Sequence, residues 1–392
     1  MQPNHQRLIM RPSHHHNDDH NDGNDAASLT RLYLVDFFSH SSLSSLEIPC
    51  SKKTMEELFS KFRNKMRGVK TPIVPFSVMN FQLVETWKKF PISITTNAKD
   101  TLKIHSEIMT DSVDDENSQE YELLAPVSIK ISYHHQCLIV SVYNNQNTIL
   151  VDLENSCRKV KKILPIQTNA IELEMNYNGL NQDALLCFRR GCVTKFDMHQ
   201  LLTERFKKIK PLWISEKCSS SASMAIVGRE VLVTGDRAKV YVLSLTNGQL
   251  LQTISLPDTI SRVTGIDFLP RNEVVMGEGH PFDRLILCRK EPNEGHEAQW
   301  RFIKMLVDEH EGPREDNDLA YPYQLVIDKA NKNIIVSSCY SHQLRIFNSN
   351  GQKIRSYGSS DQFSFPEGMC LNEHTGELYV CDTDHGCIHV FK

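Results

Sequence analysis

The chain has 392 residues, of which 40% are hydrophobic and 23% are charged, as in ordinary globular proteins. Its 44 basic residues nearly balance 48 acidic ones, and the net charge of −4 excludes a global field that would draw in nucleic acid or an anionic membrane. The length allows two or three domains, or one large repeat domain with a small companion.

Eleven cysteines occur without a C-x-x-C pair, and no apolar segment follows Met1. No apolar run approaches the roughly eighteen residues of a membrane-spanning helix. The sequence therefore predicts a reduced, intracellular, cytoplasmic protein without membrane contact. Cysteines in the strand-like runs, such as Cys137 and Cys381, are expected to pack as small hydrophobic side chains.

Residues 1–28 are rich in histidine, asparagine and aspartate, which predicts a disordered tail because such residues bury too little apolar surface to offset chain entropy. A histidine run in this tail could bind a transition metal weakly. An unstructured run does not fix ligand geometry, so we predict no specific metal site there. The run comprises His14, His15, His16 and His20.

Residues 31–107 are expected to form a small α+β domain. Strand-like runs begin near Leu32, Leu46, Phe81, Phe90 and Thr101, and apolar residues recur at helical spacing after Ser51. This β-β-α-β-β order resembles a ubiquitin-like β-grasp domain in layout only. The alternative is that these strands belong to the domain that follows or to an unfamiliar cap. Residues 108–120 are acidic and predict a linker.

From residue 121 the chain repeats itself with a period of about 44 residues. In the last two units, Pro322 aligns with Pro366 and Phe347 with Phe391. Each of six units ends in two alternating strands joined by a polar turn, which predicts an antiparallel meander. The expected fold is therefore mainly β, with a six-bladed β-propeller of four-stranded antiparallel blades over residues 121–392. The strand pairs begin at Cys137, Ala184, Glu230, Glu273, Asn333 and Glu377.

The last unit resembles the NHL repeat of six-bladed propellers. The residues that carry the resemblance are Pro366, Gly368, Leu378, Tyr379, Val380, Asp382, Thr383, Ile388, Val390 and Phe391. The preceding unit matches in part through Pro322, while Gln324 replaces the glycine and Ser338 the aspartate. The match is weak in the earlier units. The resemblance implies a rigid ring that binds a partner protein.

The chain stops at Lys392, directly after the third strand of the last unit. An open sheet edge at that point would invite aggregation, so we expect a strand from elsewhere to complete the blade. The segment Glu120–Leu124 is the predicted donor. A truncated chain, or an edge completed by another protein, are the alternatives.

Spacing between units widens over residues 291–320. The run WRFIKMLV predicts an outer strand between two long polar loops. The acidic residues from Asp308 to Asp318 lack the spacing of a calcium-binding loop and predict a solvated loop.

No catalytic motif of the G-x-S-x-G, H-E-x-x-H or P-loop type occurs in the sequence. Propellers of related shape that act as hydrolases hold a metal with repeated polar residues around the channel. Here Asp382 is answered by Ser338 and, roughly, by Glu278 and Gly235. We therefore expect Asp382 and Thr383 to brace their own turn, and we predict no enzyme activity, metal or cofactor.

Two basic groups could form a binding rim for an acidic peptide or for RNA phosphates. A solvated face is the alternative, because acidic and basic residues nearly balance over residues 121–392. The candidate rim consists of Arg158, Lys159, Lys161 and Lys162 after the first strand pair, and Arg205, Lys207, Lys208 and Lys210 after the second.

These observations predict a non-catalytic scaffold for protein–protein interaction, with partners of unspecified identity. The NHL resemblance implies an alternative, a substrate-recognition adaptor in ubiquitin ligation that lacks a RING of its own and joins ubiquitin-ligase components. A metal-dependent propeller hydrolase or an RNA binder is the third interpretation. The sequence does not indicate an oligomeric state.

Overall fold

The structure is a computed structural model that describes residues 6–10, 31–36, 45–47, 73–78, 81–91, 120–153, 158–177, 182–218, 223–235, 238–293, 296–308 and 319–392. The chain divides into two compact units, Met1–Pro72 and Ile73–Lys392. Among the described residues of the first unit, three strands form an antiparallel sheet in the order β1-β2-β3. They are β1 (Gln6–Met10), β2 (Arg31–Asp36) and β3 (Ser45–Glu47).

Strand β1 lies in the segment predicted to be a disordered tail, so that prediction is wrong for Gln6–Met10, which pair with β2. The histidine run, the helix expected after Ser51, the strand expected from Thr101 and most of the acidic linker lie outside the described residues. The likeness to a β-grasp domain therefore stays a prediction.

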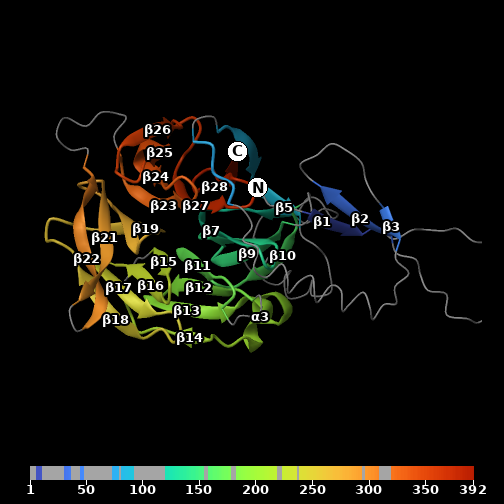
Figure 1. Ribbon diagram of the computed structural model, residues 1–392, viewed down its shortest axis with the longest axis horizontal. Coiled ribbons are helices and arrows are strands. Elements are labelled where there is room, and N and C mark those ends of the chain that lie inside the picture. Colours follow the sequence, from blue (N-terminus) through green and yellow to red (C-terminus); the bar gives the residue numbers. More distant parts are fainter. Residues whose placement is uncertain are drawn as a thin grey trace, which may run out of the picture. The chain divides into compact units, whose positions relative to one another are not determined.

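The second unit contains six four-stranded antiparallel sheets in its described residues, which confirms the predicted six-bladed propeller (Figure 1). The first blade comprises β7 (Pro126–Ser132), β8 (Cys137–Val142), β9 (Asn147–Asp152) and β10 (Val160–Leu164). The second comprises β11 (Ala170–Glu174), β12 (Ala184–Arg189), β13 (Cys192–Asp197) and β14 (Trp213–Ile214). The third comprises β15 (Met224–Val227), β16 (Glu230–Thr234), β17 (Lys239–Ser244) and β18 (Leu250–Ser255).

The remaining blades follow the same order from the channel outward. The fourth comprises β19 (Val263–Leu269), β20 (Glu273–Glu278), β21 (Arg284–Asn293) and β22 (His296–Val307). The fifth comprises β23 (Pro322–Asp328), β24 (Asn333–Ser338), β25 (Gln343–Phe347) and β26 (Lys353–Tyr357). The sixth comprises β27 (Pro366–Asn372), β28 (Glu377–Asp382), β29 (Cys387–Phe391) and β4 (Leu83–Trp87). Short elements are β5 (Lys89–Pro91), β6 (Glu120–Glu122), α3 (Met198–Thr203), η1 (Phe206–Lys208) and η2 (Cys339–Ser341).

The hydrophobic core lies between neighbouring blades. Every residue of β8 and of β24 is buried, because each of these second strands has a blade packed against both of its faces. One apolar cluster, for example, joins Leu138 and Ile149 of the first blade to Tyr379 and Ile388 of the last. The strands that were predicted from alternating residues thus form a ring of sheets, and each sheet buries the apolar face of its neighbour.

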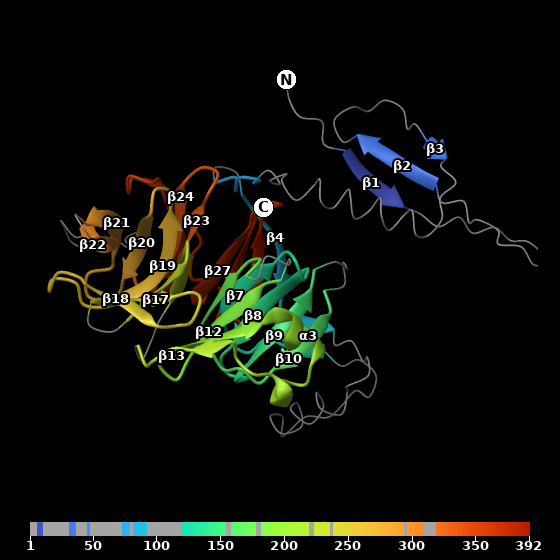
Figure 2. The same ribbon diagram turned by 60° about the horizontal axis from the view of Figure 1, so that its bottom comes forward.

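Strand β4 closes the ring by pairing antiparallel with β29 (Figure 2). The predicted donor Glu120–Leu124 is wrong, because β6 pairs instead with β5. Residues around β4 bury large aromatic side chains against the last blade, and Phe81 lies 5.7 Å from Phe391 between ring centroids. The strand expected from Phe81 therefore belongs to the propeller and not to the small domain.

The widened fourth blade carries two long strands, β21 and β22. The predicted outer strand is confirmed, but most of the polar loop expected before it is strand. Trp300 explains this extension, because its indole is buried and donates a hydrogen bond to Glu230 of the third blade at 2.9 Å. The acidic residues after Asp308 lie outside the described residues.

We expect Gly368→Ala to weaken the ring. A Cβ at residue 368 would lie 2.6 Å from the carbonyl oxygen of Val127 and 2.7 Å from Cα of Ser128, where the inner strands of the last and first blades approach. Because these contacts are backbone atoms, the strands must move apart, at a cost of about 1–3 kcal/mol. Urea unfolding of the full chain measures this loss, and an unchanged midpoint would contradict the close approach.

Candidate functional site

The first strands of the blades begin at one end of the central channel. Residues from β7, β11, β16, β19 and β23 and from the segments before the first strands line a narrow hollow of about 30 Å³ there. This volume leaves room for little more than one water molecule.

The loops that join second and third strands lie beside these strand beginnings. Ser364 and Phe365, which precede β27, donate backbone hydrogen bonds to Asp382 Oδ1 at the end of β28, at 3.0 and 2.9 Å. We call the surface formed by these loops and by the segments that precede the first strands the N-face, because the first strand of each blade begins there.

The same bracing contact recurs in four blades. The side chain that ends the second strand accepts a backbone hydrogen bond from the segment before the first strand. The pairs are Asp382 with Ser364, Ser338 with Ala320, Glu278 with Ser261, and Thr234 with Ser223. This repetition was not recognised in the sequence, where Gly235 and not Thr234 was aligned with Asp382. A hydroxyl and a carboxylate can accept the same hydrogen bond although the residue types differ.

Within its own turn Asp382 accepts a side-chain hydrogen bond at Oδ2 from His385 Nδ1 at 2.8 Å, whereas the backbone amides that bond to it belong to Ser364 and Phe365 outside the turn. The prediction for Thr383 is wrong, because its hydroxyl donates to the carbonyl oxygen of Pro126 in the first blade at 2.9 Å. Thr383 thus links the last blade to the first.

The other repeat-motif residues lie on strands of the last two blades. Pro322 begins β23, Pro366 begins β27 and Gly368 follows on that strand, whereas Tyr379 and Val380 lie on β28, and Val390 and Phe391 end β29. Except for the two prolines and Gly368, they fill the interior of the last blade or its interface with a neighbour. They form the scaffold and not a binding surface.

An aromatic patch stands on the N-face over the fourth, fifth and sixth blades. The rings of Tyr321 and Tyr340 stack with centroids 4.8 Å apart, and Phe365 meets Tyr340 edge-on at 5.4 Å. The guanidinium of Arg262 lies 5.8 Å from the centroid of the Tyr321 ring. Tyr340 is 56% exposed. The aromatic patch is defined by Arg262, Tyr321, Tyr340 and Phe365.

The backbone around the aromatic patch is held in place before any partner binds. Tyr340 lies in the short helix η2, and the amides of Cys339 and Tyr340 donate to the carbonyl oxygens of Tyr321 and Ala320, each at 3.2 Å. A preorganised surface loses less conformational entropy on binding. Tyrosine and arginine at such a place are the residue types that dominate interface energies.

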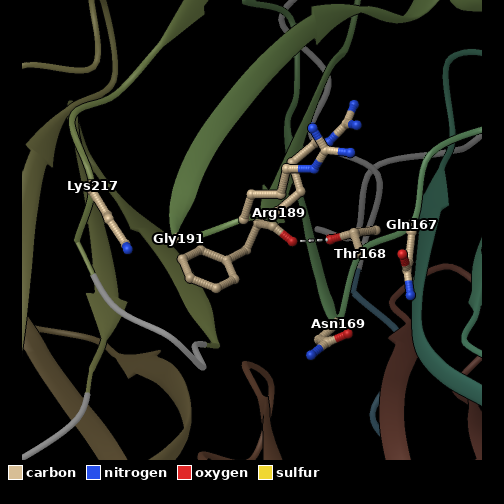
Figure 3. Close-up of a pocket in the computed structure, with 8 residues that line it drawn as sticks. Gln167, Thr168, Asn169, Arg189, Gly191 and Lys217 are labelled. Carbon is tan, nitrogen blue, oxygen red and sulfur yellow. Dashed lines mark hydrogen bonds between the residues drawn. The ribbon is translucent and has the colours of Figure 1, made fainter.

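A second feature of the N-face is a basic hollow of about 350 Å³ over the second blade. Lys217 reaches in from one side, Gln167 and Thr168 line the other, and Arg189 lies between them (Figure 3). Thr168 fixes its wall by donating a hydrogen bond to the carbonyl oxygen of Phe188 at 2.6 Å. The neighbouring Arg190 adds a further cation, so the hollow suits a carboxylate or phosphate group.

The first group of the candidate rim lies at the outermost strand β10, away from the channel. Arg158 forms an ion pair with Glu85, and its guanidinium lies 4.0 Å over the ring of Trp87. Lys161 pairs with Asp152 at 2.9 Å. Arg158 therefore links the first blade to β4 of the last, Lys161 pairs within the first blade, and Lys159 is exposed.

The second group follows helix α3, where Lys207 and Lys208 lie in η1 and both Arg205 and Lys210 are exposed beside it. The amino group of Lys162 donates to the carbonyl oxygen of Glu204, which brings the two groups together. The two basic groups were predicted to share one rim, and they lie at the outer edge of the ring. The role of this rim in binding stays a prediction.

A buried acid lies near the start of β27. Glu367 is only 8% exposed, and burial raises the pKa of its carboxyl to about 8, against the opposing effect of the neighbouring Thr383 and Tyr323 side chains. This carboxyl is therefore largely protonated at neutral pH, and its position makes stability depend on pH.

Three described side chains that could hold a metal ion meet on the last blade. Asp382, Cys387 and His389 are all buried, and their ligand atoms lie within 4.8 Å of one another. No metal was predicted here, because Asp382 was compared with the equivalent residues of the other blades and not with its neighbours on the same hairpin.

Comparisons with known proteins agree with this architecture. Residues 363–391 match the family model described as the NHL repeat, which is the unit where the resemblance was clearest. No curated protein sequence matches the chain. An auxiliary nutrient-binding protein from Bacteroides ovatus has a similar solved structure, with 12% identity, 69% of each chain covered and a TM-score of 0.52. At this identity the likeness shows the fold alone.

Within the described residues, no helix combines the length and the apolar character that crossing a membrane requires.

Proposed function

We propose that the protein is a non-catalytic interaction scaffold that binds a partner protein through the aromatic patch of its N-face. The observation that carries the proposal is Tyr340, a large aromatic side chain that is 56% exposed yet stacked on Tyr321 and fixed by backbone hydrogen bonds. Interfaces concentrate their binding energy in such anchors, surrounded by polar contacts. The basic hollow on the same face favours a partner that places an acidic group there.

The other interpretations gain less support. A channel hydrolase gains little support because the side chains that recur at the ends of the second strands accept backbone hydrogen bonds. The ion pairs of Arg158 and Lys161 disfavour RNA binding by the outer rim. The adaptor role in ubiquitin ligation rests on the NHL resemblance alone, because no described contact favours it.

The variant Tyr340→Ala tests the proposal. We expect it to weaken partner binding at least about tenfold without changing the fold, because truncating an aromatic anchor typically costs more than 1.4 kcal/mol. Quantitative affinity purification of the tagged full chain from its own cells identifies the partner, and a titration with purified partner measures the loss.

The matched control is Leu251→Ala, which removes a side chain of equal exposure, 56%, from the outer strand β18. The control should bind as the wild type does. Equal binding by Tyr340→Ala and the wild type would refute the aromatic patch as the interface.

A further inference from the structure

We infer that Asp382, Cys387 and His389 form a zinc site that fastens the last blade. The three residues share one face of the hairpin β28–β29. Asp382 is the register partner of Cys387, and His389 lies two residues further along β29, on the same side of the sheet. Carboxylate, thiolate and imidazole are the three side-chain ligands that zinc uses in proteins.

The distances between the ligand atoms fit a tetrahedral ion. His389 Nε2 lies 3.2 Å from Asp382 Oδ2 and 3.4 Å from Cys387 Sγ. Bonds of about 2.0 Å to nitrogen and oxygen and about 2.3 Å to sulfur place tetrahedral ligands about 3.3–3.6 Å apart. Two of the three distances are therefore close to those of a tetrahedral site, and the third, from Asp382 to Cys387 Sγ, is within 4.8 Å.

The surrounding contacts orient these ligands as outer contacts do in metal sites. The other nitrogen of the imidazole, His389 Nδ1, lies 3.0 Å from the hydroxyl of Thr86 on β4. Backbone amides of Ser364 and Phe365 donate to Asp382 Oδ1, and the Ser364 amide also lies 3.2 Å from Oδ2, the oxygen that faces the imidazole. His385, which is 43% exposed, brings Nδ1 within 2.8 Å of Asp382 Oδ2 and so helps to orient this carboxylate.

A nucleophilic cysteine is the competing interpretation of this cluster, and the geometry opposes it. In a catalytic triad the carboxylate contacts the imidazole nitrogen that faces away from the nucleophile. Here Asp382 and Cys387 approach the same nitrogen, Nε2, and the thiol is buried. A metal ion bound between three ligand atoms requires this arrangement, in which the carboxylate and the thiol both approach Nε2 of the imidazole.

The inferred zinc ion would be structural. It bonds to β28 and β29 directly, and through His389 it fixes Thr86 of β4, so it fastens the three outer strands of the blade that closes the ring. When Zn²⁺ binds, the thiol of Cys387 releases its proton to solvent and becomes the sulfur ligand. Free zinc at one hundred times its Kd should raise the unfolding midpoint by about 4 °C.

Cobalt substitution of the full chain tests the inference. After removal of metals with a chelator, Co²⁺ should give a thiolate-to-cobalt absorption band and the visible spectrum of tetrahedral cobalt. The histidine run of the tail cannot give the thiolate band, because no cysteine precedes Cys50. Cys387→Ser should lose the band, whereas Cys192→Ser, a half-buried thiol on β13, should keep it.

A measurement on the wild type guards against a variant that fails to fold. X-ray absorption at the zinc edge should show one sulfur and three nitrogen or oxygen neighbours. A shell without sulfur, the absence of a thiolate band in the wild type, or a band that persists in Cys387→Ser would overturn the inference.

Discussion

Removal of residues 1–92 is expected to abolish folding of the propeller, whereas removal of residues 1–72 is expected to leave its unfolding midpoint unchanged. The longer deletion removes β4 and four buried aromatic side chains, Phe76, Phe81, Trp87 and Phe90. Truncating one such side chain costs about 3–5 kcal/mol, so together they exceed about 12 kcal/mol. The whole stability of a domain is about 5–15 kcal/mol.

The two deletions separate closure by β4 from any contribution of the first unit, whose boundary falls at Pro72. Thermal unfolding followed by circular dichroism measures both. A stable propeller after removal of residues 1–92 would contradict closure by β4, because that chain keeps the alternative donor Glu120–Glu122 and lacks β4 together with the buried aromatic residues around it.

Glu367→Gln is expected to stabilise the protein increasingly as the pH rises from 5 to 8. The folded pKa of about 8 exceeds the ordinary value of 4.5, so the folded state holds a proton that the unfolded state releases over this range. Wild-type stability from this group is therefore complete below pH 4.5 and is lost as the pH rises through 8. Glutamine has nearly the same shape as the protonated glutamate side chain, but it does not titrate.

We expect the stability difference between Glu367→Gln and the wild type to grow by about 3 kcal/mol between pH 5 and pH 8, since each unit of pKa shift corresponds to about 1.4 kcal/mol and relaxation reduces the total. Urea unfolding at several pH values measures it. Glu373→Gln, at a partly buried and ion-paired surface glutamate, is the control and should show no such growth. A pH-independent difference at Glu367 would contradict a carboxyl that stays protonated.

The ring was predictable from the sequence because each blade repeats one strand pattern. The paired second and third strands begin where the repeats placed them, as Cys137 and Glu377 show. The closing strand was not predictable in this way. β4 is an outer strand with exposed residues such as Leu83 and Val84, and its pairing with β29 joins the beginning and the end of the second unit. Glu120–Leu124 was predicted instead because this segment directly precedes the first blade in the sequence.

The candidate site was harder to predict than the fold, because its residues come together only in the ring. Arg262, Tyr321 and Phe365 precede three different first strands, and Tyr340 lies in the loop of one blade. No sequence spacing connects them. Tyr340 could have been recognised from the sequence as a candidate binding residue. It is a large aromatic residue in a short polar turn between two strands, where its side chain is expected to be exposed to solvent. The basic rim was visible in sequence because its charges are consecutive.

The central claim is that a partner protein sits on the aromatic patch. The most direct measurement places a photo-crosslinking amino acid at position 340 of the full chain, and the same amino acid at position 251 as the reference, in the cells that make the protein. The account predicts one dominant crosslinked partner from position 340, mapped by mass spectrometry, that is absent from position 251. The same crosslinks from both positions, or a dominant partner from position 251 alone, would contradict it.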